Sequence, residues 1–230
     1  MPALDKSMLM ADAIAQIFDG ARVMIGGFGV PGTPFLLIEE LVRQGPKNLT
    51  IIKNDANEAG MGVDRLLQAG MVARLITSHI GLNGNAVRMM NAGEIEVEFV
   101  AQGILAERIR AAGAGLKGFV TDIGIGTLLA EGKSRVDVDG ETCLFEPALE
   151  ADFALVHAAR ADTFGNLVYE ATARNFNPLM AMAAECTIVE AEAILPIGDI
   201  DPDAVHTPAP FVDHLVALGD LTEVYGVIKR

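Results

Sequence analysis

Apolar residues in the first half of the chain follow two alternating patterns. Short continuous apolar runs predict buried strands, whereas apolar residues spaced three or four apart predict amphipathic helices. The short runs predict strands at 23–25, 49–52, 72–77 and 95–99. The helical spacing predicts helices at 7–18, 34–44, 62–69, 84–92 and 103–112. Strands that alternate with helices in this way favour an α/β fold, an open and mainly parallel sheet with helices on both faces.

Two local features refine this picture. Thr33 followed by Pro34 predicts an N-cap and a first helical residue, which places the start of the second helix after the glycines that precede it. Charged residues alternate with apolar ones over 94–98, so we expect this strand to lie near an edge of the sheet, with its glutamates on a solvated face.

The pattern changes after residue 118. Alternating apolar and polar residues on both sides of Asp139 and Gly140 predict a β-hairpin over 136–144. Further strands are predicted at 153–156 and 187–189, and a helix at 178–185. No Ser-rich or Pro-rich linker separates the two halves. We therefore expect one domain over residues 1–230, with a mixed or antiparallel hairpin excursion from the parallel sheet.

Composition narrows the classes of partner. The net charge is −14 and no basic stripe stands out, which makes nucleic acid an unfavourable partner. Cys143 and Cys186 form no CxxC pair and no cluster with histidine, so we expect free thiols in a reducing cytoplasm and no metal site. No signal peptide opens the chain, and no uncharged apolar run reaches about 18 residues, so we expect no membrane span.

The glycine-rich run at 26–32 is the main candidate for chemistry. Gly27, Gly29 and Gly32 form a G-x-G-x-x-G pattern between a predicted strand and a predicted helix, the context of a dinucleotide-binding loop. In such a loop the helix starts within the glycines and points its amino terminus at the pyrophosphate. Here the helix is predicted to start later, and residues 113–118 carry the same pattern without a preceding strand. Both facts weaken the dinucleotide interpretation.

The remaining interpretations of the glycines are tight turns or a ligand pocket. Three glycine clusters occur, at 26–32, 113–118 and 124–126. Open α/β sheets bind ligands at the carboxyl ends of their strands, and small residues there let a ligand approach backbone N–H groups. Such N–H groups can stabilise a developing oxyanion. We therefore expect the clusters to gather at that edge of the sheet.

Residues 19–34 carry a more specific signal than the glycine pattern alone. They read DGARVMIGGFGVPGTP: an Asp-Gly, three apolar residues, Gly-Gly-Phe, and then a spaced Gly and Pro. This resembles the amino-terminal signature of the family I 3-oxoacid CoA-transferases, at every position. The resemblance continues in the family's order and spacing at 78–81, 93–97, 101–103, 105–110, 113–115, 124–127 and 173–177. It covers about residues 10–215 and is to the α subunit, or to the amino-terminal half of fused members.

The resemblance implies half of an enzyme. Family members transfer CoA by ping-pong chemistry, in which a glutamate carboxylate attacks the acyl-CoA donor and becomes a glutamyl-CoA thioester. That glutamate lies in a Ser-Glu-Asn-Gly stretch of the β half, and no such stretch occurs in this chain. We therefore expect a β-subunit partner, an α2β2 assembly, no activity without the partner, and no cofactor beyond the CoA thioester substrate. The acetate/butyrate–acetoacetate and 3-oxoadipate types are the closest.

The same resemblance implies candidate site residues. Asn54 and Gln102 match family positions that line the pocket near the thioester carbonyl, where neutral amides stabilise an oxyanion without protonating the nucleophile. Without the family, a turn cap for Asn54 and a helix start for Gln102 would be the simpler interpretations. Residues expected to contact substrate or CoA are Gly26, Gly27, Phe28, Gly29, Gly113, Ala114 and Gly115.

The resemblance is incomplete at several positions, and other functions remain open. Ala101 stands where the family usually has Pro, and Lys117 and Asp122 depart from it in a stretch expected to shape the acyl pocket. A non-catalytic CoA- or nucleotide-binding module with the same fold is the main alternative function. A sugar-phosphate isomerase is a weaker one, because its acid/base carboxylates and phosphate loop cannot be placed in this sequence.

Overall fold

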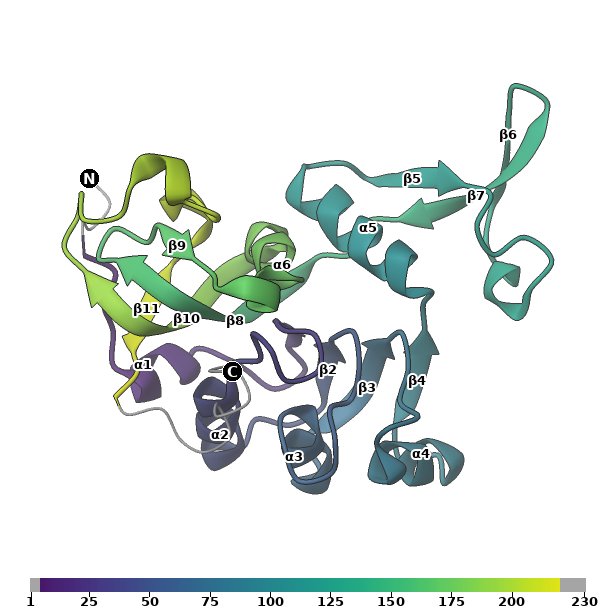
Figure 1. Ribbon diagram of the computed structural model, residues 1–230. Helices are drawn as coiled ribbons and strands as arrows, with labels where there is room; N and C mark the ends of the chain where they lie inside the picture. The colour runs from purple at the N-terminus through teal and green to yellow at the C-terminus, as the bar shows by residue number, and fades with distance from the viewer. Residues whose placement is uncertain (1–4, 220–230) are drawn as a thin grey trace.

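The computed structural model describes residues 5–219, and a seven-strand parallel sheet forms its centre. The order of the parallel strands is β11-β10-β8-β1-β2-β3-β4, and the short strand β9 pairs antiparallel with β8 (Figure 1). The parallel strands are β1 (Arg22–Ile25), β2 (Leu49–Ile52), β3 (Val72–Thr77), β4 (Glu96–Phe99), β8 (Ala151–Asp162), β10 (Ala184–Leu195) and β11 (His214–Ala217), and β9 spans Leu167–Val168.

Helices cover both faces of this sheet. One face carries α1 (Met10–Ile14), α2 (Phe35–Gln44), α3 (Val63–Gln68) and α4 (Gly84–Asn91), and the other carries α5 (Gln102–Gly113) and α6 (Asn177–Ala183) (Figure 1). Short 3-10 turns occur at Leu128–Ala130, Ala171–Arg174, Pro202–Ala204 and Ala209–Phe211. The predicted α/β class, with helices on both faces, is therefore confirmed.

Strand alternation divides the core into two layers. Along β1, Val23 and Ile25 pack into the cluster under α1 to α4, whereas Met24 packs into the cluster under α5 and α6. Successive side chains of a strand point to opposite faces, so a strand covered on both faces must be apolar throughout. This explains why the central strands appear in the sequence as short continuous apolar runs.

The chain reverses direction across the sheet at β1. It runs outward from β1 through β2 and β3 to β4, and then returns to β8 on the other side of β1. β4 ends the order, so the prediction of an edge strand over 94–98 is confirmed. In open parallel sheets, a crevice forms at the carboxyl ends of the strands where the order reverses. Here that point is the end of β1, directly before Gly26.

A second, three-stranded antiparallel sheet projects beyond α5 (Figure 1). Its strands are β5 (Gly118–Thr121), β7 (Glu141–Pro147) and β6 (Arg135–Val138), in the order β5-β7-β6. The turn between β6 and β7 has positive φ at both Asp139 (53°) and Gly140 (84°). Positive φ at both central residues defines the hairpin turn that Asp-Gly favours, so the predicted hairpin is confirmed.

Two predicted helix boundaries were wrong. The helix predicted at 7–18 is only Met10–Ile14, because Ser7 bridges to Leu215 and the Met8 N–H donates to the Leu215 carbonyl at 2.8 Å. The helix predicted at 178–185 ends at Ala183, because Ala184 already pairs with Ala151 in the sheet. In both places sheet pairing with a distant segment replaces the local helical pattern.

Candidate active site at the carboxyl ends of the strands

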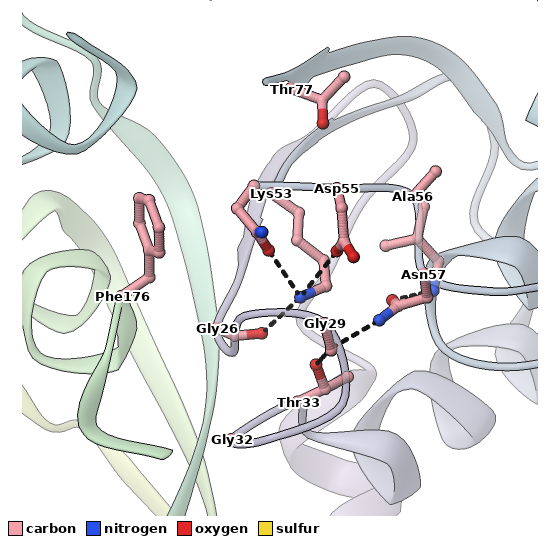
Figure 2. A network of polar contacts seen from close by, with 12 residues as sticks. Gly26, Gly29, Gly32, Thr33, Lys53, Asp55, Ala56, Asn57, Thr77 and Phe176 are labelled. Atoms are coloured by element: carbon pink, nitrogen blue, oxygen red, sulfur yellow. Dashed lines mark hydrogen bonds and ion pairs between the residues drawn. The ribbon is translucent and has the colours of Figure 1, made fainter. Parts of the chain in front are cut away.

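The glycine loop, residues 26–33, leaves the end of β1 and folds back on itself. Gly27, Gly29 and Gly32 have φ of 93°, 60° and 77°, a region that glycine adopts at little cost. The Thr33 hydroxyl donates to the Gly29 carbonyl at 2.7 Å, and the Asn57 side-chain Nδ2 donates to the same carbonyl at 2.7 Å (Figure 2). The loop is therefore held closed from both of its sides.

Gly26 has no room for a side chain. A Cβ there would lie 1.8 Å from Oδ1 of Asn177, the first residue of α6. Asn177 Nδ2 in turn donates to the carbonyls of Gly32 at 3.0 Å and Ala173 at 2.8 Å. The amide of Asn177 thus ties the glycine loop to the start of α6, and the close approach requires glycine at position 26.

The start of α2 differs from the prediction. The helix begins at Phe35 with Pro34 as its N-cap, and the Thr33 hydroxyl donates to the Gly29 carbonyl in the loop. The buried carboxylate of Glu190 on β10 serves the helix instead, accepting from the Leu37 N–H at 3.0 Å. An anion therefore already occupies the helix terminus where a dinucleotide would place its pyrophosphate. This geometry argues against the dinucleotide interpretation.

The Glu190 carboxylate belongs to a buried charged chain. His157 on β8 places Nδ1 2.9 Å from Glu190 Oε1 and Nε2 3.2 Å from Glu192 Oε1. Burial alone would lower the pKa of His157, but the two carboxylates outweigh it and raise that pKa above its ordinary value. A protonated imidazole can donate to both carboxylates at once, which stabilises the two negative charges against burial.

The end of β2 supplies two buried polar residues next to the glycine loop. Lys53 and Asn54 are both fully buried. Lys53 Nζ lies 3.3 Å from the Gly26 carbonyl (Figure 2). It also lies 3.4 Å from Asn54 Oδ1. Asn54 Nδ2 has no hydrogen-bond partner among the described residues. A buried donor without an acceptor costs about 1–3 kcal/mol, so this N–H group is suited to receive a ligand oxygen.

Gln102 reaches the same place from β4. It is the first residue of α5, and its Oε1 lies 2.8 Å from the hydroxyl of Ser78, which follows β3. The Ser78 N–H donates to the Asn54 carbonyl at 3.1 Å. Ser78 therefore joins the two predicted oxyanion residues. With its Oε1 engaged, Gln102 keeps Nε2 as a donor.

The structure brings together only part of the predicted site. The glycine loop lies beside Asn54 and contains four of the predicted residues, Gly26, Gly27, Phe28 and Gly29. Gly113, Ala114 and Gly115 lie instead at the opposite end of α5 from Gln102, about 16 Å along the helix axis at 1.5 Å per residue. A Cβ on Gly113 would lie 2.7 Å from Met182 Cβ, so helix packing explains this glycine. A ligand-contacting role for 113–115 stays a prediction.

An apolar hollow opens beside the glycine loop. It measures about 510 Å³ and is lined by Phe28, Pro31, Thr172 and Asn175. Phe28 is 44% exposed, and its ring lies 6.4 Å from the Phe176 ring, centroid to centroid. The hollow could accept an uncharged part of a ligand whose polar end lies at Asn54.

Sequence reasoning missed Lys53, Glu190 and His157 as parts of this site. Each carries a weak local signal, a single ionisable residue next to or within an apolar strand run. This signal does not show whether such a side chain is buried in the site or exposed on the surface, because the residues that contact it are distant in sequence. The described residues contain no group of three or more His, Cys, Asp or Glu side chains that could hold a metal ion.

The fold and the site define a class of protein, the CoA-transferase-like α/β proteins with a glycine loop at the end of the first strand. The family model described as coenzyme A transferase matches residues 7–218. The chain belongs to the coenzyme A transferase family.

Relatives are named as one subunit of such enzymes. The chain is 45% identical over 211 residues to the alpha subunit of the acetate CoA-transferase of Escherichia coli (strain K12), covering 92% of this chain and 96% of that one. It is 46% identical over 216 residues to one subunit of the 3-oxoadipate CoA-transferase of Acinetobacter baylyi, covering 93% and 95%. The predicted resemblance to the α subunit is confirmed.

A solved structure supports the fold. An acyl-CoA transferase from Escherichia coli O157:H7, in a thioester complex with CoA, superimposes with a TM-score of 0.87 at 24% sequence identity. The match covers 96% of this chain but 49% of that one. This chain therefore corresponds to about half of the larger protein. No helix within residues 5–219 is both long and apolar enough to cross a membrane.

Proposed function

We propose that the chain is the α subunit of a CoA-transferase that moves CoA from succinyl-CoA or acetyl-CoA to a short-chain 3-oxoacid such as acetoacetate. It works with a separate β subunit in an α2β2 assembly in the cytoplasm. The relatives named acetate and 3-oxoadipate CoA-transferases support this choice of acids. Both described cysteines are free thiols, which is compatible with a reducing compartment.

The proposed chemistry is ping-pong. A glutamate carboxylate supplied by the β partner attacks the thioester carbonyl and displaces the CoA thiolate, which gives an acyl-glutamyl anhydride. The thiolate then attacks the glutamyl carbonyl, which releases the donor acid and leaves a glutamyl-CoA thioester. The acceptor carboxylate takes the CoA by the same steps in reverse order. Each attack places negative charge on a carbonyl oxygen.

The unpartnered Asn54 Nδ2 carries this proposal. It is a buried donor at the carboxyl ends of the strands, next to a closed glycine loop and joined through Ser78 to Gln102. Neutral amide donors in a buried site stabilise an oxyanion strongly, because the site excludes water. They also leave the nucleophilic carboxylate ionised, since they have no acidic proton to give to it.

The carboxylates around the glycine loop support a nucleophile that comes from the partner. Asp55 is paired with Lys53 at 3.5 Å, and Glu190 is engaged by His157 and by the start of α2. Both side chains are buried. Each carboxylate thus already faces a cation or a hydrogen-bond donor of this chain, which supports a nucleophile that is supplied from elsewhere.

Reconstitution tests the proposal. Co-expression with a β subunit that carries a Ser-Glu-Asn-Gly motif should give CoA transfer from succinyl-CoA or acetyl-CoA to acetoacetate, whereas the chain alone should give none. Mass spectrometry of the complex with acyl-CoA should locate one glutamyl-CoA adduct, on the β chain. A complex that assembles but transfers CoA to none of the short acids would contradict the substrate assignment. CoA binding without any adduct would favour the non-catalytic module.

A further inference from the structure

Lys53 is an unusual residue for its position. It directly follows β2, its side chain is 0% exposed, and its ammonium group lies against the glycine loop, next to Gly26 (Figure 2). Fully buried lysines are rare, because taking the charge out of water is costly unless it is well paired. The contacts of Lys53 therefore indicate what the buried charge does.

Within residues 5–219, Lys53 Nζ makes three polar contacts, and all are long. Nζ lies 3.3 Å from the Gly26 carbonyl oxygen, 3.4 Å from Asn54 Oδ1 and 3.5 Å from Asp55 Oδ1. Ordinary N–H···O hydrogen bonds centre near 2.9–3.0 Å. Weak pairing leaves the charge poorly compensated, and burial lowers the pKa of Lys53 to about 8, against the opposing effect of Asp55.

The ammonium group determines how the Asn54 amide is turned. It has three donors and no acceptor, so the side-chain atom of Asn54 that faces it must be Oδ1. Nδ2 then points away from Lys53, where it has no partner among the described residues. A neutral amine can also accept a hydrogen bond, so a deprotonated Lys53 would tolerate the reversed amide. The reversed amide would present an oxygen, which repels an oxyanion.

We propose that Lys53 is a positioning residue of the CoA-transfer site: its ammonium group holds the Gly26 carbonyl and turns the Asn54 amide so that Nδ2 faces the reacting carbonyl oxygen. This inference rests on the proposed function of the site. The Lys53 ammonium group lies on the oxygen side of the Asn54 amide, 3.4 Å from Oδ1, so Lys53 acts through Asn54.

The surroundings of Lys53 identify the groups that influence it. Asp55, two residues on, is the charged group that acts on Lys53. β1 contributes the uncharged Gly26 carbonyl, and β3 ends in the uncharged Thr77. The nearest titratable side chain at the end of β3 is His79, whose Nδ1 lies 3.1 Å from the Ser78 hydroxyl. A His79→Gln variant therefore removes this side chain and leaves Lys53 in place.

The activity test uses the assembled complex and compares pH profiles of kcat. Lys53 is charged below its pKa of about 8, so kcat of the wild type should fall above that pH, to about a fifth of its plateau at pH 9 if the uncharged state keeps about a tenth of the activity. Lys53→Met should lower kcat about tenfold at pH 7, remove the alkaline fall, and leave KM within about twofold. Lys47→Met, an exposed lysine before the same strand, should behave as wild type, and His79→Gln should keep the alkaline fall.

A second variant guards against a folding artefact. Lys53→Met leaves Asp55 buried without its partner, which is destabilising. The double variant Lys53→Met/Asp55→Asn removes both charges and should assemble with the β subunit normally, yet keep the low, pH-independent kcat. Wild-type kcat in the assembled double variant, or an unchanged alkaline fall, would overturn the proposal.

A measurement without catalysis separates this proposal from the proposed function. In the isolated chain with ¹⁵N-labelled asparagine, the Asn54 side-chain NH₂ signals, assigned with Asn54→Asp, should shift with a midpoint near pH 8. In Lys53→Met they should not shift. If the complex is inactive but the Asn54 signals shift with pH, the proposed function is wrong, whereas Lys53 still orients the Asn54 amide. If the complex is active but the signals do not titrate, the Lys53 proposal fails.

Discussion

At the scale of single residues, the site depends on asparagine side chains. Neighbouring donors and acceptors determine which way the nitrogen and the oxygen of each amide point. Asn177 fills the space that a side chain on Gly26 would need, Asn57 holds Gly29 closed, and Asn54 turns Nδ2 to a place without an acceptor. In Asn177 and Asn57, both the nitrogen and the oxygen of the side chain make hydrogen bonds within the chain. In Asn54, Nδ2 has no hydrogen-bond partner among the described residues. The unpaired donor is the better candidate for ligand contact, because an unused buried donor costs stability.

Removal of the two predicted oxyanion donors should reduce turnover. We expect Asn54→Ala and Gln102→Ala each to lower kcat of the assembled enzyme about 10²–10³-fold, the effect of losing one oxyanion-hole donor. Steady-state kinetics of the complex would measure this. Asn91→Ala, an exposed amide at the end of α4, is the matched control and should change kcat little. Near-normal kcat in both site variants would remove these residues from the mechanism.

At the scale of elements, α2 takes its amino-terminal stabilisation from a strand. The Glu190 carboxylate accepts from the Leu37 N–H across 153 positions of sequence, in place of a local cap. The negative charge also complements the positive end of the helix dipole. His157 on β8 stabilises this buried charge through its contact with Glu190. Glu190 therefore links α2, β8 and β10 into one electrostatic unit behind the glycine loop.

This unit should make stability depend on pH. The pKa of His157 is raised in the folded state, so its contribution is fully present below the unfolded pKa near 6.5 and is lost as pH rises through the folded pKa. His157→Gln should therefore be destabilised relative to wild type at pH 6, and the difference in the free energy of unfolding should shrink towards pH 9. Denaturant unfolding at several pH values would measure it.

The control for this prediction is another histidine. His214 lies on β11 and its Nε2 is 3.3 Å from the exposed Gln16 side chain. His214→Gln removes this contact and no buried ion pair, so it should change the free energy of unfolding little. A His157→Gln difference that stays constant or grows with pH would mean that the imidazole is not protonated between the two carboxylates.

At the scale of the whole molecule, the charge of the chain suits only part of a CoA-binding site. Its net charge is −14, and CoA carries several negative phosphate charges. The glycine loop, Asn54 and the apolar hollow suit the thioester end of CoA, but they provide no cluster of positive charge for the nucleotide. We therefore expect the β subunit to supply most of the phosphate contacts.

Binding measurements would test this division. The isolated chain should bind CoA at least about tenfold more weakly than the assembled complex, and only the complex should lose affinity steeply with salt. Calorimetry at two ionic strengths would measure both effects. Pantetheine, which lacks the nucleotide phosphates, is the matched ligand and should bind the isolated chain about as well as CoA does. Equal CoA affinity for chain and complex would contradict the division.

Local chemistry made a large part of this molecule predictable. The strands at 49–52 and 72–77 were predicted at their observed bounds, because apolar runs and sheet burial coincide there. The Asp139-Gly140 turn depends only on backbone conformations that these two residues favour. The boundaries at 7–18 and 178–185 failed because pairing partners far along the chain competed with the helical pattern.

The sequence by itself determined the α/β class and the family, since these follow from periodicity and from a resemblance that extends over most of the chain. The site roles of the two amides, Asn54 and Gln102, stay predictions. Only the tertiary structure decided which glycines stand beside those amides. Residues 26–29 meet Asn54 because β1 and β2 are neighbours in the sheet, whereas 113–115 lie at the far end of a helix that starts at Gln102. The same holds for the environment of Lys53. Its burial and its long contacts arise from strand order and the closed glycine loop, and no local pattern encodes that arrangement.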